Sequence, residues 1–261
     1  KMNEEKLLEI VNPEFYESIK AEINREIGKR VEKYTGKKMD RQMPDLQILI
    51  DLKNETISIN PRSLFIFGKY QKLARGIPQA TWYCPKCNGK GCEYCKGTGL
   101  LYSTSVQMII EKPLLKMSKG KKSKLHASGR EDIDARCLGW RPFVIEIVKP
   151  KVRKIDLKKA MKEINKSKKV KVKGLKIIKD ARNIVRMLKT EKSDKTYLAI
   201  VKFEKNLDKS KLKELKKLEN CTITQKTPLR VLRKESKKHI VFAFRQKNFK
   251  AKNNRFCRFV H

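Results

Sequence analysis

The chain has 261 residues, of which 39% are hydrophobic, so it is long and apolar enough to form the cores of two ordinary domains. It carries 65 Lys and Arg against 28 Asp and Glu, which gives a formal net charge of +37. Because this charge is spread along the whole chain, it predicts a broad surface that binds nucleic-acid phosphates. The plainer alternative is a lysine-rich proteome that places lysine on every solvent-exposed face. No apolar run is long enough to span a bilayer and no signal peptide is visible, so we expect a cytoplasmic protein without a membrane partner.

The first part of the chain predicts one helix and three strands. Apolar residues recur every four positions in the segment 13–34, which indicates an amphipathic helix. Alternation in 45–52 and in 56–60, separated by a short polar turn, predicts a hairpin, and 63–67 is a further strand candidate. A basic segment, 68–76, follows this strand.

The middle of the chain predicts less regular structure. We expect two short ordered pieces at 105–111 and 113–117, followed by a mobile basic loop at 118–124 rich in Gly and Lys. We place the domain boundary near Glu111, with an RNA-binding domain at 1–111 and a catalytic domain at 112–261.

The remaining elements mix strands and helices without strict alternation. We expect a strand at 143–148 and two helices capped by Asp156 and Asp180. A strand at 196–203 and a helix around 212–218 follow. This order favours the α+β class over a doubly wound α/β fold.

Four cysteines form two Cys-x-x-Cys pairs within the segment 84–97; they are Cys84, Cys87, Cys92 and Cys95. Each pair is followed two residues later by a glycine that lets the turn close. Four thiolates at this spacing satisfy the tetrahedral preference of Zn²⁺ and leave no open position, so we expect a structural zinc site; free thiols or a redox pair are the alternatives. Lys86, Lys90 and Lys96 in this basic insert are candidate contacts to RNA.

The segment from His126 to Arg136 is rich in carboxylates and guanidinium groups. Taken alone it is ambiguous, because Ser128-x-x-Glu131 fits a helix capping box and clustered Asp and Arg commonly form surface ion pairs.

Together with its surroundings, this segment resembles a known family. Gly129 to Arg136, followed by Leu138-Gly139 and by Arg141 to Ile147, resembles the signature of the Pus-ten family of tRNA pseudouridine synthases. Three other stretches agree: Pro61 to Gln79 resembles the end of the family's THUMP-containing N-terminal domain, the cysteine pairs resemble the zinc element of its archaeal members, and Gln225 to Leu232 resembles a late catalytic segment. The resemblance covers roughly Asp45 to Arg233.

The resemblance implies a THUMP-like N-terminal domain with a zinc knuckle, then a mixed and antiparallel synthase sheet with helices. The implied activity is isomerisation of uridine to pseudouridine in the TΨC arm of tRNA, typically at positions 54 and 55, without an organic cofactor. Asp132 matches the essential carboxylate, which must be ionised and close to the ribose as nucleophile or base. The implied substrate-binding residues are Tyr197, Arg130, Arg136, Lys226 and Arg230. The plainer alternatives are a core aromatic for Tyr197 and solvated charges for Lys226 and Arg230.

Two departures from the family pattern stand out. Where the pattern has Leu-Gly-x-Gly-Arg-Pro-Phe, this chain has Trp140 directly before Arg141 and is one residue shorter, which could shift the Asp132 loop. The motifs expected after Arg233 are not found, so we expect a catalytic sheet that is incomplete at its C-terminus, and the start at Lys1 suggests that an N-terminal part is absent. We expect a monomer. A non-catalytic tRNA-binding protein is the second hypothesis; a THUMP-bearing enzyme of another kind is disfavoured because no glycine-rich nucleotide loop is found.

Overall fold

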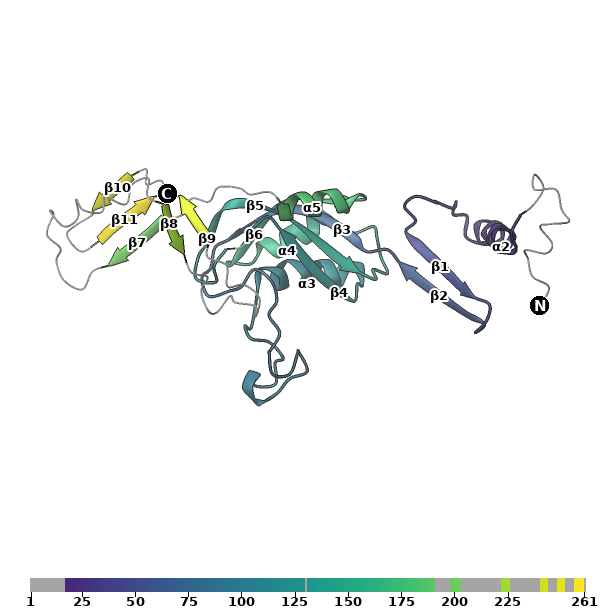
Figure 1. Ribbon diagram of the computed structural model, residues 1–261, viewed down its shortest axis with the longest axis horizontal. Helices are drawn as coiled ribbons and strands as arrows, with labels where there is room; N and C mark the ends of the chain where they lie inside the picture. Colours follow the sequence, from purple (N-terminus) through teal and green to yellow (C-terminus); the bar gives the residue numbers. More distant parts are fainter. Residues whose placement is uncertain are drawn as a thin grey trace. The chain divides into compact units, whose positions relative to one another are not determined.

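The computed structural model describes residues 17–129, 131–190, 198–202, 222–225, 240–243, 248–251 and 256–260. The chain divides into two units, Lys1–Glu191 and Lys192–His261. Helices and antiparallel strands are mixed in sequence order, which confirms the α+β class (Figure 1). Within the described part, none of the helices has the length and apolar character needed to cross a membrane.

The first unit contains α2 (Ile19–Thr35), β1 (Leu46–Asp51), β2 (Thr56–Pro61), β3 (Leu64–Lys72), the 3-10 turn η2 (Glu93–Cys95), α3 (Val106–Ser118), β4 (Lys122–Ala127), β5 (Cys137–Val148), α4 (Leu157–Asn165), β6 (Val170–Ile178) and α5 (Ala181–Thr190). The second unit contains β7 (Leu198–Lys202), β8 (Thr222–Gln225), β9 (Ile240–Ala243), β10 (Asn248–Ala251) and β11 (Phe256–Val260).

The N-terminal helix and hairpin form as predicted. The Ser18 side chain caps α2 by accepting a hydrogen bond from the Ala21 amide at 3.2 Å, and Gly36 ends the helix with a left-handed φ of 65°. The expected start of this helix near residue 13 lies outside the described residues. β1 and β2 pair antiparallel from Leu46 opposite Pro61 onward, which confirms the hairpin.

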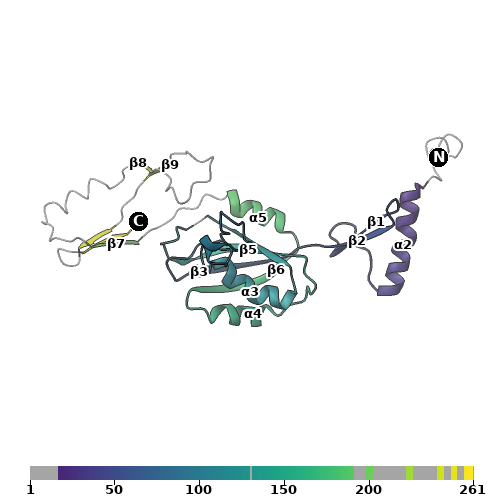
Figure 2. The ribbon, with the colours of Figure 1, turned by 90° about the horizontal axis from the view of Figure 1, so that it is seen from below.

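A four-stranded antiparallel sheet in the order β4-β5-β3-β6 forms the centre of the first unit. Helices α3 and α4 cover one face of this sheet, and α5 lies against β4 and β5 on the other (Figure 2). The core lies under α3 and α4 and consists mainly of Leu64, Ile66, Tyr70, Val106, Ile110, Leu114, Phe143, Ile145, Ile147, Ala160, Ile164, Val170 and Val172. The domain boundary predicted near Glu111 falls inside this unit and stays a prediction.

Helix α3 corrects two sequence predictions. Instead of two short pieces, one helix runs through Pro113, because Val106, Ile110 and Leu114 lie one above the other and are fully buried. Their burial outweighs the backbone hydrogen bond that proline cannot donate. The mobile loop expected at 118–124 is also wrong: Ser118 is buried at the helix end, and β4 already begins at Lys122.

The later elements agree with the predicted pattern. The Asp156 carboxylate accepts a hydrogen bond from the Lys159 amide at 2.9 Å and caps α4, as expected. Asp180 precedes α5, and its carboxylate accepts a hydrogen bond from the Asn183 side chain at 3.2 Å. The expected cap on α5 stays a prediction. In the second unit β10, β11 and β7 form one antiparallel sheet, and β8 pairs with β9. The helix expected at 212–218 lies outside the described residues.

Candidate active site and metal centre

The central strand β3 carries two polar side chains into the core. Its alternation buries Leu64, Ile66, Tyr70 and Lys72 on the face covered by α3 and α4. The Tyr70 ring packs edge-to-face on Phe143, with ring centroids 5.9 Å apart. The buried Tyr70 hydroxyl and the buried Lys72 ammonium need hydrogen-bond partners, so polar groups from elsewhere in the chain must lie at this end of β3.

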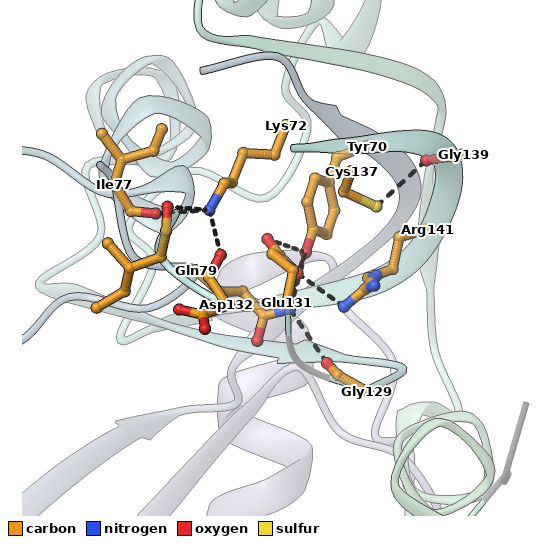
Figure 3. Close-up of polar contacts among 11 residues, drawn as sticks. Tyr70, Lys72, Ile77, Gln79, Gly129, Glu131, Asp132, Cys137, Gly139 and Arg141 are labelled. Atoms are coloured by element: carbon orange, nitrogen blue, oxygen red, sulfur yellow. Dashed lines mark hydrogen bonds and ion pairs between the residues drawn. The ribbon is translucent and has the colours of Figure 1, made fainter. Parts of the chain in front are cut away.

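The Lys72 ammonium finds its partners on two loops. It donates to the backbone carbonyl oxygens of Ile77 at 2.8 Å, Asp132 at 2.9 Å and Ile133 at 3.0 Å (Figure 3). An ammonium has three donors, and all three are used. Burial lowers the pKa of Lys72, and the negative charges of Glu131 and Asp132 oppose that shift.

The Glu131 carboxylate is the centre of a second group of buried contacts. The Tyr70 hydroxyl lies 3.0 and 2.9 Å from its two oxygens, and Arg141 Nη1 lies 2.7 Å from Oε2. Gln79 Nε2 lies 3.2 Å from the same oxygen and also donates to the Gly129 carbonyl at 3.1 Å. Burial opposes the charge of Arg141, but the Glu131 carboxylate holds its pKa above the usual value. Figure 3 shows these side chains converging beside the loop that carries Asp132.

Asp132 itself lies between two buried residues. Glu131 is 6% exposed and Ile133 7% exposed, whereas the Asp132 side chain is exposed. The loop is tied further by the Gly76 amide, which donates to the Ile133 carbonyl at 3.0 Å. The backbone on both sides of Asp132 is therefore fixed while its carboxylate faces outward from the fold.

The structure places few of the other predicted site residues. Arg136 is exposed on the same loop as Asp132. Arg130, Tyr197, Lys226 and Arg230 lie outside the described residues. Residues 131–136, the described part that follows Ser128 and Gly129, begin no helix, and the Glu131 side chain is used in the buried network, so the capping-box interpretation is wrong.

The residues that hold this loop were missed in the sequence. The basic composition of the segment 68–76 and its resemblance to the family do not indicate a buried lysine, but the alternation of Leu64, Ile66, Tyr70 and Lys72 puts one on the buried face. That signal could have identified Lys72. Nothing in the local pattern indicates Gln79 or Arg141 as partners of Glu131, because those contacts join segments far apart in the chain.

The four cysteines of the predicted metal site come together in an insert between β3 and α3. Their sulfur atoms all lie within 4.8 Å of one another. Three pairs are 3.8 Å apart: Cys84 with Cys92, Cys87 with Cys95, and Cys92 with Cys95. Four thiolates held about 2.3 Å from one ion at tetrahedral angles would be about 3.8 Å apart, so this set fits a tetrahedral metal.

The backbone around the cysteines is folded to support such a site. Amides of Gly91, Cys92 and Gly99 donate to cysteine sulfurs at 3.1–3.2 Å. Burial opposes ionisation of Cys95, yet the amides of Cys92 and Gly99 lower its pKa to about 6. The backbone hydrogen bond of Cys92 with Cys95 lowers the pKa of Cys92, but burial and the neighbouring thiols outweigh it and raise that pKa to about 11, so Cys95 ionises before Cys92. A side chain at Gly99 would put Cβ 2.4 Å from the Gly89 carbonyl oxygen, so the two Cys-x-x-Cys turns can pack together only with glycine there. The cluster could hold a metal ion.

A cleft of about 1110 Å³ opens elsewhere, on the α5 face of the sheet. Its described lining includes Arg62, Arg182 and Arg186, together with His126 and Glu146, but not Asp132. It is therefore separate from the Asp132 loop.

Trp140 was expected to disturb the loop that carries Asp132. It lies in β5, which runs unbroken from Cys137 to Val148, and the Lys173 ammonium lies 4.3 Å from its ring centroid. A shift of the Asp132 loop caused by Trp140 stays a prediction.

The fold and site define a class: a strongly basic α+β chain with a four-cysteine cluster that could hold a metal ion and an exposed aspartate on a loop held by buried residues. Comparison with known families agrees. The model described as "Pus10, C-terminal" matches residues 65–256, and the model described as "Pus10 THUMP domain, archaeal" matches residues 1–51. The chain belongs to the Pus10 family. The match extends past Arg233, where the motif resemblance had ended.

Curated relatives carry the same family name. A Methanocaldococcus jannaschii protein named tRNA pseudouridine synthase Pus10 is 46% identical over 220 residues, which are 83% of this chain and 48% of the relative. Proteins of the same name from Methanococcus voltae and Archaeoglobus fulgidus are 43% and 42% identical, over 82% of this chain in each case and 43% and 59% of the relatives. The chain thus spans about half the length of the curated relatives it matches.

Proposed function

We propose that this chain acts in the isomerisation of uridine to pseudouridine in tRNA, in the TΨC arm at positions 54 and 55. The observation that carries the proposal is the position of Asp132: the aspartate of the family motif is exposed on a loop whose flanking residues are buried. The curated relatives named tRNA pseudouridine synthase support the same reaction.

Asp132 is the proposed catalytic residue. The reaction breaks the bond between the base and its ribose and rejoins the base through carbon, so all atoms are conserved and no organic cofactor is required. A negatively charged oxygen serves either as the nucleophile or as the base, and both roles need the carboxylate held in one place next to the sugar. The target nucleotide must be turned out of the folded tRNA to reach it. Tyr197, Arg130, Arg136, Lys226 and Arg230 are proposed to hold that nucleotide.

The metal knuckle is proposed to hold structural Zn²⁺. Four cysteine thiolates fill the tetrahedral positions, so the ion has no place for a substrate and serves to fold the insert. The exposed lysines Lys86, Lys90 and Lys96 then lie on a rigid, basic projection suited to RNA phosphates. The positive charge of the whole chain supports a tRNA partner, bound by a monomer in the cytoplasm.

The proposal is tested by incubating unmodified tRNA with the protein and mapping pseudouridine. The design compares wild type with Asp132→Asn, which keeps the shape of the side chain but removes its charge, and with Asp134→Asn as the matched control two residues away. Product from wild type and from the control, with none from Asp132→Asn at equal tRNA binding, is the expected result. Binding without product from wild type would instead support the non-catalytic tRNA-binding hypothesis.

A further inference from the structure

We propose that Lys72 and Gln79 are positioning residues that hold the Asp132 loop against the end of β3. The inference rests on the proposed function of Asp132. Lys72 is fully buried at the end of a core strand, a position that the reaction by itself does not require. Its three hydrogen bonds go to backbone carbonyls on two separate loops, one after β3 and the other between β4 and β5.

A buried ammonium of this kind is costly unless it has a structural task. Its removal from water carries a large desolvation cost, and its three hydrogen bonds to described residues go to neutral backbone carbonyls rather than to a carboxylate. A leucine or methionine at the end of a core strand would avoid that cost. Lysine instead links two loops, because its one nitrogen holds the carbonyls of Asp132 and Ile133 in place relative to the carbonyl of Ile77. Two of these three carbonyls belong to the proposed catalytic residue and its neighbour.

Gln79 fixes the other end of the same loop. Its side-chain amide donates to the Gly129 carbonyl at 3.1 Å and lies 2.8 Å from the Tyr70 hydroxyl. Since Gly129 precedes Asp132 by three residues, the loop is held before the aspartate by Gln79 and after it by Lys72. Both attachments start from β3 or the residues just after it, so the central strand of the sheet sets the position of the carboxylate.

The charge of Lys72 adds an electrostatic effect to this geometry. The ammonium donates to the backbone carbonyl of Asp132. The negative charges of Glu131 and Asp132 oppose the lowering of the Lys72 pKa that burial causes, which favours the charged ammonium that holds the loop.

The test compares Lys72→Met, which keeps the length of the side chain but removes its donors and charge, with Lys69→Met. Lys69 lies on the same strand but is exposed on its other side. Three quantities are measured: the Kd for unmodified tRNA, the single-turnover rate at saturating enzyme, and hydrogen exchange of the amides in 131–136. We expect Lys72→Met to lower the rate about 100-fold with a nearly unchanged Kd and to speed exchange in that segment alone. Lys69→Met should leave both the rate and the exchange as in wild type.

Two further variants keep the result interpretable. Lys72→Arg retains a cationic donor and should recover part of the rate. If Lys72→Met does not fold, Gln79→Met serves as the second variant, because it removes an uncharged hydrogen bond to the Gly129 carbonyl. It should show the same pattern of a slower rate and faster hydrogen exchange in 131–136. Exchange in 131–136 that stays as in wild type, or a full rate in either methionine variant, would overturn the proposal. Absence of product from wild type would overturn the proposed function instead, and exchange would still decide whether Lys72 holds the loop.

Discussion

Arg141 and Glu131 form a buried ion pair, with Nη1 and Oε2 2.7 Å apart and side chains that are 13% and 3% exposed. The two residues come from β5 and from the loop that precedes it, so the pair joins the loop to the sheet. Removing the cation leaves a carboxylate inside the fold whose remaining hydrogen-bond donors among the described residues, Tyr70 and Gln79, are neutral.

Arg141→Met should therefore destabilise the protein strongly. We expect a loss of about 3 kcal/mol in the free energy of unfolding, because breaking a buried pair leaves an uncompensated charge. Urea denaturation measures it, with Arg136→Met as the control: that arginine is exposed, and its loss should change the free energy by less than about 0.5 kcal/mol. Equal stability of the two variants would contradict the structural role of the pair.

Cys84 is the fully buried member of the four-cysteine cluster. We expect one zinc ion per chain in protein prepared under reducing conditions and its loss in Cys84→Ser, because a serine hydroxyl cannot replace a thiolate ligand. Elemental analysis measures the content. Cys137→Ser is the matched control, since that thiol lies outside the cluster and should leave the metal in place. A metal-free wild-type sample would refute the site.

The Tyr70 hydroxyl should resist ionisation. Burial raises its pKa, and the nearby Glu131 charge raises it further. In an alkaline absorbance titration of the folded protein we expect one tyrosine not to ionise near pH 10, and Tyr70→Phe to leave that part of the curve unchanged. Because the pKa is higher in the folded state than in the unfolded state, the stability that this group contributes is present below about pH 10 and is lost as the pH rises above it. Ionisation of all tyrosines in the folded protein near pH 10 would contradict this burial.

Binding to tRNA should depend steeply on salt. The net charge of +37 predicts that many phosphates are neutralised and that counterions are released on binding. Between 50 and 200 mM salt we expect the affinity to fall by about 10³ or more, which filter binding can measure. An affinity that hardly changes over this range would mean that the lysines face solvent without contacting RNA.

Much of the fold could be predicted from local patterns. The hairpin of β1 and β2, the N-terminal cap of α4 at Asp156 and the clustering of the four cysteines depend on residues close together in the chain, and the structure confirms each prediction. Helix α3 was not, because a proline normally marks an end, and only the burial of residues on both sides of it reveals a continuous helix. The candidate site was predicted only in part: the motif indicated Asp132, whereas the contacts of Lys72 that hold it join residues about 60 positions apart and depend on the tertiary fold.

The role of Asp132 is tested most directly by pseudouridine mapping on unmodified tRNA after reaction with wild type and with Asp132→Asn, at matched tRNA binding. We expect pseudouridine in the TΨC arm with wild type and none with the variant. Pseudouridine formed equally by both proteins would contradict this role, because the exposed carboxylate of Asp132 would then have no part in the reaction.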